Sequence, residues 1–112
     1  DILHVNDLFS LIDIQLNNFP NFNGKTFNIG GGIENTISLK ELTKICQKIV
    51  GKKIKISSET LNRSADIPIY ITDTSKVSKL SSWKPIYSPE EIIIDTFNWL
   101  KSNESILKKI LS

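Results

Sequence analysis

The sequence predicts a mixed α/β fold with more helix than strand. Several segments of its 112 residues carry apolar side chains at helical spacing. Strand-like runs are short, and they lie at Ile2–Val5, Thr26–Ile29 and Lys53–Ser57. Two or three short strands are few for an independent sheet, so their apolar faces need neighbours that this sequence does not supply. We therefore expect residues 1–112 to form a single domain that is a fragment of a longer chain.

The first helix is expected to begin with Asn6 as its cap. Asp7 would then lie in the first turn, where a negative charge suits the helix dipole. The apolar positions of this helix are Leu8, Leu11, Ile12 and Leu16. Residues 17–24 are rich in asparagine and contain Pro20, which is typical of a loop.

The next helix has the clearest signals. Ser38 and Glu41 have the spacing of a capping box, in which each side chain bonds the free backbone N–H of the other residue. Gly51 fits the left-handed residue that commonly follows a helix. The apolar stripe of this helix consists of Leu39, Leu42, Ile45, Cys46 and Ile49.

Three further helices are expected in the last third of the chain. A short one begins at Asp73 or Thr74 and is stopped by residues 83–85. Ser88 and Glu91 form a second capping box, which begins a longer helix. The apolar positions of the last two helices are Ile93, Phe97 and Leu100, then Ile106, Leu107, Ile110 and Leu111.

Composition argues against several classes of protein. The formal net charge of +2 is too small to indicate a nucleic-acid partner. No apolar run approaches the roughly 20 residues that span a bilayer, and the start lacks the features of a signal peptide. The single cysteine, Cys46, excludes an internal disulfide and fits a reducing cytoplasm. With His4 as the only histidine, the sequence shows no metal-ligand spacing, so we expect no metal site.

A glycine-rich turn, Gly30–Gly32, follows a predicted strand and lies six residues before a helix. The backbone N–H groups of such a turn could approach a phosphate. The spacing is not the G-x-G-x-x-G of dinucleotide sites, and no acidic residue follows at the end of a second strand. A tight turn that needs positive φ is therefore the favoured interpretation.

Arg63 is the only arginine among the 14 basic residues. Its planar guanidinium can grip a diphosphate through two parallel charge-assisted bonds, which lysine cannot do. The alternative is a surface ion pair with Asp66 or Glu59. The sequence alone leaves both interpretations open.

The aromatic residues and the carboxylates give weaker indications. Tyr70 has an apolar ring and a polar tip, which would suit it to cover a sugar or a base, but without further context core packing is favoured. Trp83 and Trp99 are expected to anchor the core and are assigned no function. No catalytic arrangement can be argued, because His4 has no identifiable nucleophile beside it. The pair Glu90–Glu91 is explained by its place at a helix start.

Five blocks of residues follow one another in a recognisable order. They are Asp1–Leu8 (R-D-x-x-H-V-x-D without its leading arginine), Phe27–Gly30 with Asn35–Ser38 (F-N-x-G … S), Arg63–Asp66 (R-x-G-D), Asp73–Lys76 with Trp83–Pro85 (D-x-S-K-A … L-G-W-x-P) and Ser88–Trp99 (E-G-L-x-x-T-x-x-W). Over nearly its whole length the chain thereby resembles the extended short-chain dehydrogenases/reductases that act on nucleotide sugars. The Gly-Gly-Gly turn and Asn35 make it look most similar to the CDP-paratose (CDP-tyvelose) 2-epimerases within that family.

This resemblance implies the C-terminal, substrate-binding part of an NAD(P)-binding, Rossmann-like enzyme without its dinucleotide-binding half. Arg63 would bind the substrate diphosphate, and Asp66 would bond the nucleotide ribose. Ile37 would pack on the base, Tyr70 would line the same pocket, and Asn35 joins them as a substrate-binding residue. NAD would be bound by the N-terminal part, and the glycine turn would be structural.

The chain departs from the family pattern in two places. Ala65 replaces the usual glycine between Arg63 and Asp66, and Ser81–Ser82 replace the Leu-Gly before Trp83. The NAD loop, the catalytic Ser/Thr and the Tyr-x-x-x-Lys pair of the family have no counterpart in the sequence. We therefore expect no catalytic residue here and no activity from the segment alone.

The leading hypothesis is a parent enzyme that is an NAD-dependent sugar-nucleotide epimerase, an isomerase that transiently oxidises a sugar carbon and reduces it from the other face. This segment would bind the nucleotide-diphosphate sugar and orient it. The alternatives are a 4,6-dehydratase or reductase, a non-enzymatic α/β interaction domain, or a structural module in which Arg63 has no role. We expect a cytoplasmic protein. A homodimer is one option, because the isolated segment would expose the apolar face that meets the NAD-binding domain.

Overall fold

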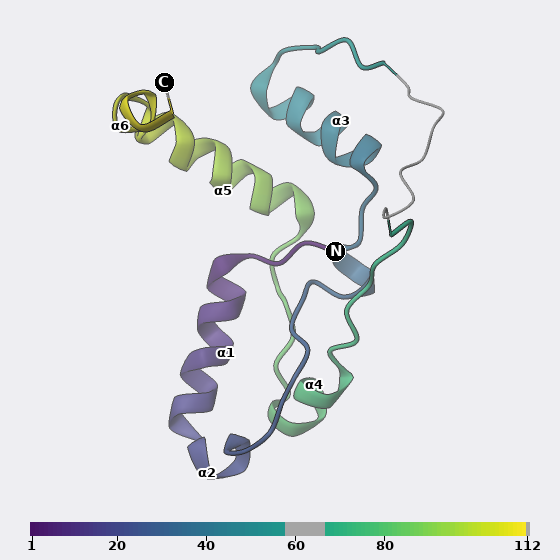
Figure 1. Cartoon of the computed structure of the whole chain (residues 1–112), viewed down its shortest axis with the longest axis vertical. Helices are drawn as coiled ribbons and strands as arrows, with labels where there is room; N and C mark the ends of the chain where they lie inside the picture. Colours follow the sequence, from purple (N-terminus) through teal and green to yellow (C-terminus); the bar gives the residue numbers. More distant parts are fainter. Residues whose placement is uncertain (58–66, 112) are drawn as a thin grey trace.

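The computed structural model describes residues 1–57 and 67–111, and these residues form six α-helices and one short 3-10 helix (Figure 1). The helices are α1 (Val5–Asn17), α2 (Phe19–Phe22), the 3-10 helix Ile33–Asn35, α3 (Leu39–Val50), α4 (Ser75–Ser81), α5 (Pro89–Ser102) and α6 (Glu104–Leu111). Helices α1, α2 and α4 lie toward one end of the long axis, and α3, α5 and α6 lie toward the other (Figure 1). None of these helices is long and apolar enough to cross a membrane.

The strand part of the predicted α/β fold is wrong for the part of the chain that the structure describes. Residues 26–29 and 53–57 are irregular, and the run Ile2–Val5 leads into α1 instead of a strand. A strand needs a partner whose backbone completes its ladder of hydrogen bonds. The described residues offer these segments no such partner, so the helix-rich half of the prediction is confirmed and the sheet is not.

The capping signals are confirmed at α3 and α5. The hydroxyl of Ser38 accepts from the Glu41 N–H, and the Glu41 carboxylate accepts from the Ser38 N–H. Ser88 and Glu91 repeat this arrangement at the start of α5. Gly51 ends α3 with φ of 71°, as predicted for a left-handed residue. Both boxes depend only on side chains three residues apart, so they form without help from the rest of the fold.

The start of α1 differs from the prediction. The cap is His4, not Asn6, because the His4 Nδ1 atom accepts from the Asn6 N–H at 3.0 Å. Asn6 therefore lies inside the first turn. Residues 17–24 are not a plain loop, since Pro20 sits in the first turn of the short helix α2.

Helix α4 begins and ends through local contacts. The Asp73 carboxylate accepts from the Ser75 N–H at 2.9 Å, whereas Thr74 occupies the cap position without a side-chain bond. Ser82 follows the helix with φ of 60°, a left-handed conformation that costs a non-glycine residue about 1 kcal/mol. The serine therefore adopts the geometry that the glycine of the family motif would adopt without strain.

The core is small and lies between α1, α2 and α4. Its buried members are Leu11, Phe22, Val77 and Trp83, with Leu3, Ile14, Phe27 and Ile29 packed against them. Trp83 is thus a core anchor, as predicted. Trp99 is not, because 57% of its side chain is exposed on α5. The expected buried face of α5 is only half-buried at Ile93 and Phe97, and Leu100 is exposed.

Asp7 connects α1 to the segment that follows α4. Its side chain is 2% exposed, and its carboxylate accepts from the N–H groups of Ile86 at 3.0 Å and Tyr87 at 3.3 Å. The Asp7 carbonyl also accepts from Trp83 Nε1 at 3.1 Å, and the same indole N–H reaches Ser10 Oγ at 3.0 Å. Asp7 therefore satisfies the backbone of a segment that has no helix or strand of its own.

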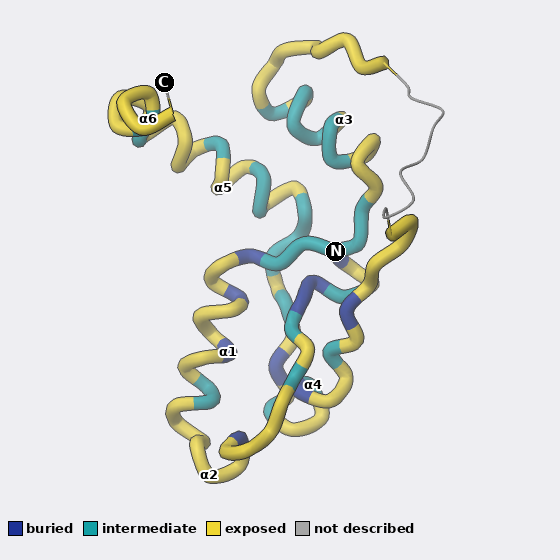
Figure 2. Tube along the Cα trace, in the orientation of Figure 1, coloured by how far each residue is buried: buried dark blue, intermediate teal, exposed yellow. Residues whose placement is uncertain are grey.

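The chain leaves much of its apolar surface uncovered. Its accessible surface is 9235 Å² and its radius of gyration is 17.5 Å. A compact monomer of this mass would expose roughly 6,200 Å², with a radius of gyration of about 13 Å. Each of the six α-helices carries at least one exposed large apolar side chain, and exposed residues predominate along the trace (Figure 2). The described helices therefore leave part of their apolar surface uncovered.

Replacing Asp7 by alanine should destabilise the protein by about 3 kcal/mol, because the buried carboxylate is lost and two backbone N–H groups lose their acceptor. Asp7→Asn keeps one acceptor oxygen and should cost less. Urea unfolding followed by circular dichroism measures both. Asp13→Ala, at an exposed position of α1, is the matched control and should stay within about 0.5 kcal/mol. Equal losses at the two positions would contradict the role of Asp7.

Stability should fall as the pH drops below the ordinary glutamate value of 4.5. Hydrogen bonds from the backbone and side chain of Ser38 hold the pKa of Glu41 below that value, and the side chain and backbone of Ser88 do the same for the pKa of Glu91. A lowered folded-state pKa adds stability above the unfolded value, and this is lost as the folded carboxylate protonates.

Unfolding free energies measured between pH 3 and pH 6 test this expectation. The double variant Glu41→Gln/Glu91→Gln should show a flatter pH dependence, because glutamine can fill a capping box but does not titrate. A residual slope should remain, since Ser75 lowers the pKa of Asp73 and Lys108 lowers that of Glu104. An unchanged slope in the double variant would show that the two boxes do not carry the effect.

Candidate functional site

Three segments that are distant in sequence meet at Asp1. Its carboxylate accepts from the N–H groups of Gly32 at 3.0 Å and Thr72 at 2.9 Å. The Asp1 nitrogen donates to the Tyr70 carbonyl at 3.3 Å, and the Ile2 N–H donates to the Asn35 carbonyl at 3.1 Å. We call this meeting point of residues 1–2, 30–35 and 70–72 the Asp1 junction. It brings two of the predicted site residues, Asn35 and Tyr70, to the same short stretch of chain.

The glycine turn is a packed element of this junction. A Cβ atom at Gly31 would overlap the Ile2 carbonyl and the Asn35 side chain, and one at Gly30 would overlap Thr72. Gly32 has φ of 70°, which glycine adopts without strain. The predicted structural turn is therefore confirmed. The chain itself fills the space where a side chain would stand on Gly30 and Gly31, so packing explains the small residues at these two positions.

The predicted site residues that the structure describes have different surroundings. Asn35 is buried, and its Nδ2 atom donates to the Tyr87 carbonyl at 2.9 Å. Tyr70 is 64% exposed, so the core packing favoured for it earlier is wrong. Ile37 is half-buried immediately before the Ser38 cap of α3. Arg63 and Asp66, together with Glu59 as a possible ion-pair partner, lie outside the described residues.

Sequence reasoning missed a group around His4. The His4 ring is buried and stacks on Tyr87, with centroids 4.1 Å apart and planes inclined by 19°. His4 Nε2 lies 3.3 Å from the Asp95 carboxylate of α5, while Nδ1 accepts from the Asn6 N–H. Because Nδ1 is an acceptor, the proton of the neutral ring is on Nε2, which faces the Asp95 carboxylate. The only available signal was a lone histidine directly before a helical pattern, and the structure gives it a structural role.

A concave region adjoins the Asp1 junction. It has a volume of about 500 Å³, which is in the range of small-molecule sites. Its lining comes from the glycine turn, the start of α4 and the segment before α5, and consists of Gly31–Asn35, Thr74, Ser78 and Lys84–Pro89. Asn35 is the one predicted site residue in this lining. Backbone groups of the turn and polar side chains of α4 therefore face the same hollow.

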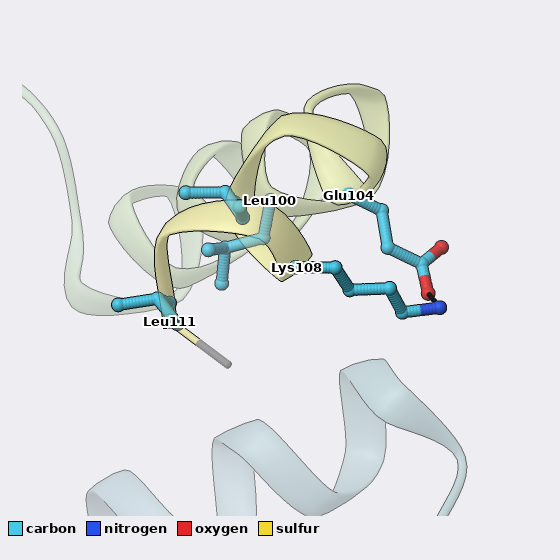
Figure 3. A pocket seen from close by; sticks show the side chains of 5 residues that line it. Leu100, Glu104, Lys108 and Leu111 are labelled. Atoms are coloured by element: carbon cyan, nitrogen blue, oxygen red, sulfur yellow. Dashed lines mark ion pairs between the residues drawn. The ribbon is translucent and has the colours of Figure 1, made fainter.

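A second hollow lies between α5 and α6 and contains none of the predicted residues (Figure 3). Leu100, Leu107 and Leu111 make it apolar, and the Glu104–Lys108 ion pair at 2.7 Å borders it. Its chemistry offers little to a charged nucleotide. Within residues 1–57 and 67–111, no group of three or more His, Cys, Asp and Glu side chains could hold a metal ion.

Comparison with known proteins places this chain beside nucleotide-sugar epimerases. No known family profile matches it. It is 40% identical to a UDP-glucuronate 4-epimerase of Thermodesulfobacterium geofontis over 74% of this chain and 25% of the relative. It is 29% identical to a CDP-paratose 2-epimerase of Salmonella typhi over 91% of this chain and 30% of the relative. It is 28% identical to a UDP-glucose 4-epimerase, GEPI48, of Cyamopsis tetragonoloba over 92% of this chain and 29% of the relative.

These matches confirm the resemblance that the motifs predicted. All three relatives are epimerases named for a nucleotide sugar, and the chain corresponds to their C-terminal parts. The chain spans only a quarter to a third of the length of these relatives. The relatives name three different nucleotide sugars, so they do not single out the CDP-paratose enzymes.

Gly31→Ala should cost about 3 kcal/mol of stability, because the new methyl group meets a backbone carbonyl that cannot move aside without displacing the Asp1 junction. Gly51→Ala is the matched control. Gly51 has φ of 71° but open space around its Cα, so only the backbone strain of about 1 kcal/mol should appear. Urea midpoints of both variants measure the difference. Equal losses of stability in the two variants would mean that the close contact at Gly31 does not contribute to the cost of the substitution.

Proposed function

We propose that this chain is the C-terminal, nucleotide-sugar-binding segment of an NAD-dependent sugar-nucleotide epimerase of the extended short-chain dehydrogenase/reductase family. The observation that carries the proposal is the match, over most of this chain, to three epimerases that act on different nucleotide sugars by name. The common element of those names is a sugar joined to a nucleoside diphosphate. The proposed substrate is therefore this class of molecule.

The proposed binding role of the chain depends on Arg63 and Asp66. The guanidinium of Arg63 would hold the diphosphate through paired charge-assisted bonds, and Asp66 would accept from the ribose. Three residues separate Asp66 from Tyr70, whose backbone carbonyl accepts from the Asp1 nitrogen. The exposed ring of Tyr70 and the half-buried Ile37 supply apolar surface for the base. Asn35 would support them, because its bond to the Tyr87 carbonyl fixes the turn that precedes Ile37.

Binding remote from the reacting sugar carbon can still raise the rate, because it orients the substrate. The family's glycine-rich NAD loop has no counterpart in this sequence, so in this proposal NAD and the redox step belong to a part of the enzyme outside this chain. A cytoplasmic location and a homodimer are further parts of the proposal. The relatives favour an epimerase over the 4,6-dehydratase and reductase alternatives, since each of the three is an epimerase by name.

Arg63→Ala in the complete enzyme should weaken binding of UDP- and CDP-sugars by roughly 10- to 100-fold, the loss expected for charged hydrogen bonds. Isothermal titration calorimetry measures the affinity. Lys109→Ala removes one positive charge from an exposed position of α6 and should leave it unchanged. An Arg63→Ala enzyme that binds with wild-type affinity would show that Arg63 does not hold the diphosphate. A wild-type enzyme that neither binds nor epimerises any nucleotide sugar would overturn the proposal as a whole.

A further inference from the structure

Helix α1 has two apolar faces, and only one of them is used by the described residues. Asp7, Leu11 and Ile14 face the core and the segment after α4. Four other apolar residues, Val5, Phe9, Ile12 and Leu16, follow one another at helical spacing. With roughly 100° of rotation per residue, these four lie on the face opposite Leu11. We call them the outer stripe of α1.

The outer stripe is exposed along its whole length. Val5 and Leu16 are each 70% exposed, Phe9 is 69% exposed and Ile12 is 43% exposed. A helix that is apolar on two opposite faces is typically buried between two layers. One layer is the small core beneath Leu11. The second layer is not formed by the described residues.

A recess continues the stripe onto α5. It has a volume of about 480 Å³ and is lined by His4, Val5, Asp95, Thr96 and Trp99. Val5 is thus shared between the stripe and the recess. The exposed indole of Trp99 extends the apolar surface from α1 to a second helix, so the surface is a continuous patch on two elements.

We infer that this patch, the outer stripe with Trp99, is the docking surface for the NAD-binding part of the longer enzyme. The inference rests on the proposed function. Between 70% and 75% of the length of each relative lies outside the match, which leaves a body large enough to form the missing layer.

The charges of α1 argue for a protein layer over a lipid surface. Helices that lie on membranes carry Lys and Arg on their polar face. Helix α1 contains Asp7 and Asp13 and no basic residue.

Thiol labelling of the complete enzyme tests the inference. In a Cys46→Ser background, a cysteine is placed at Phe9 on the outer stripe or at Asn17, an exposed position on a different side of the same helix. Maleimide should react with Phe9→Cys at least tenfold more slowly than with Asn17→Cys. Where Phe9→Cys prevents folding, Ile12→Cys takes its place with the same expectation.

Equal labelling rates at the two positions would overturn the inference. Protection of Phe9→Cys that disappears when a dimer is diluted to monomer would also overturn it, because a second copy would then cover the stripe. Labelling requires no nucleotide sugar, so its outcome is separate from the titration with Arg63→Ala. An enzyme that fails to bind nucleotide sugars but protects Phe9→Cys from maleimide would contradict the proposed function and still support the docking surface.

Discussion

The carboxylate of Asp7 is the interaction on which the described structure depends most. It lies in the first turn of α1 and accepts from two backbone N–H groups of the segment between α4 and α5. That segment has no helix or ladder to satisfy its own backbone, and a charged acceptor forms bonds roughly twice as strong as a neutral one. Once Asp7 fixes the segment, Trp83 enters the core, and Tyr87 stacks on His4 and receives the bond from Asn35.

The same strategy recurs at Asp1, where one carboxylate holds the glycine turn against the segment that carries Tyr70. Carboxylate side chains in this chain therefore accept the backbone hydrogen bonds that neighbouring strands would accept in a complete sheet. Such bonds fix where segments lie, but they bury little apolar surface. This explains how the junction can be well defined while the surface of the whole chain remains about half as large again as that of a compact monomer.

Local signals in the sequence predicted most of the helices, whereas the predicted strands, which depend on distant partners, did not form among the described residues. The capping boxes at Ser38 and Ser88 act over three residues, so the sequence contains all that forms them. The strand at residues 53–57 depends on a partner that the described residues lack, and alternation alone could not reveal that. The second role of Asp7, beyond its favourable place near the helix dipole, required knowing where residues 86–87 lie. The predicted contributions of Arg63 and Asp66 to the site are still predictions, since both residues lie outside the described part of the chain.

The irregular segment after α3 has a consequence for solubility. Ile54 and Ile56 are exposed and alternate with the exposed Lys53 and Lys55. An irregular stretch with two exposed β-branched side chains is a template on which another copy could add as a strand and begin a fibril. The ammonium groups oppose that stacking, because each added copy would align like charges at strand spacing. The lysines therefore oppose self-assembly of this exposed segment.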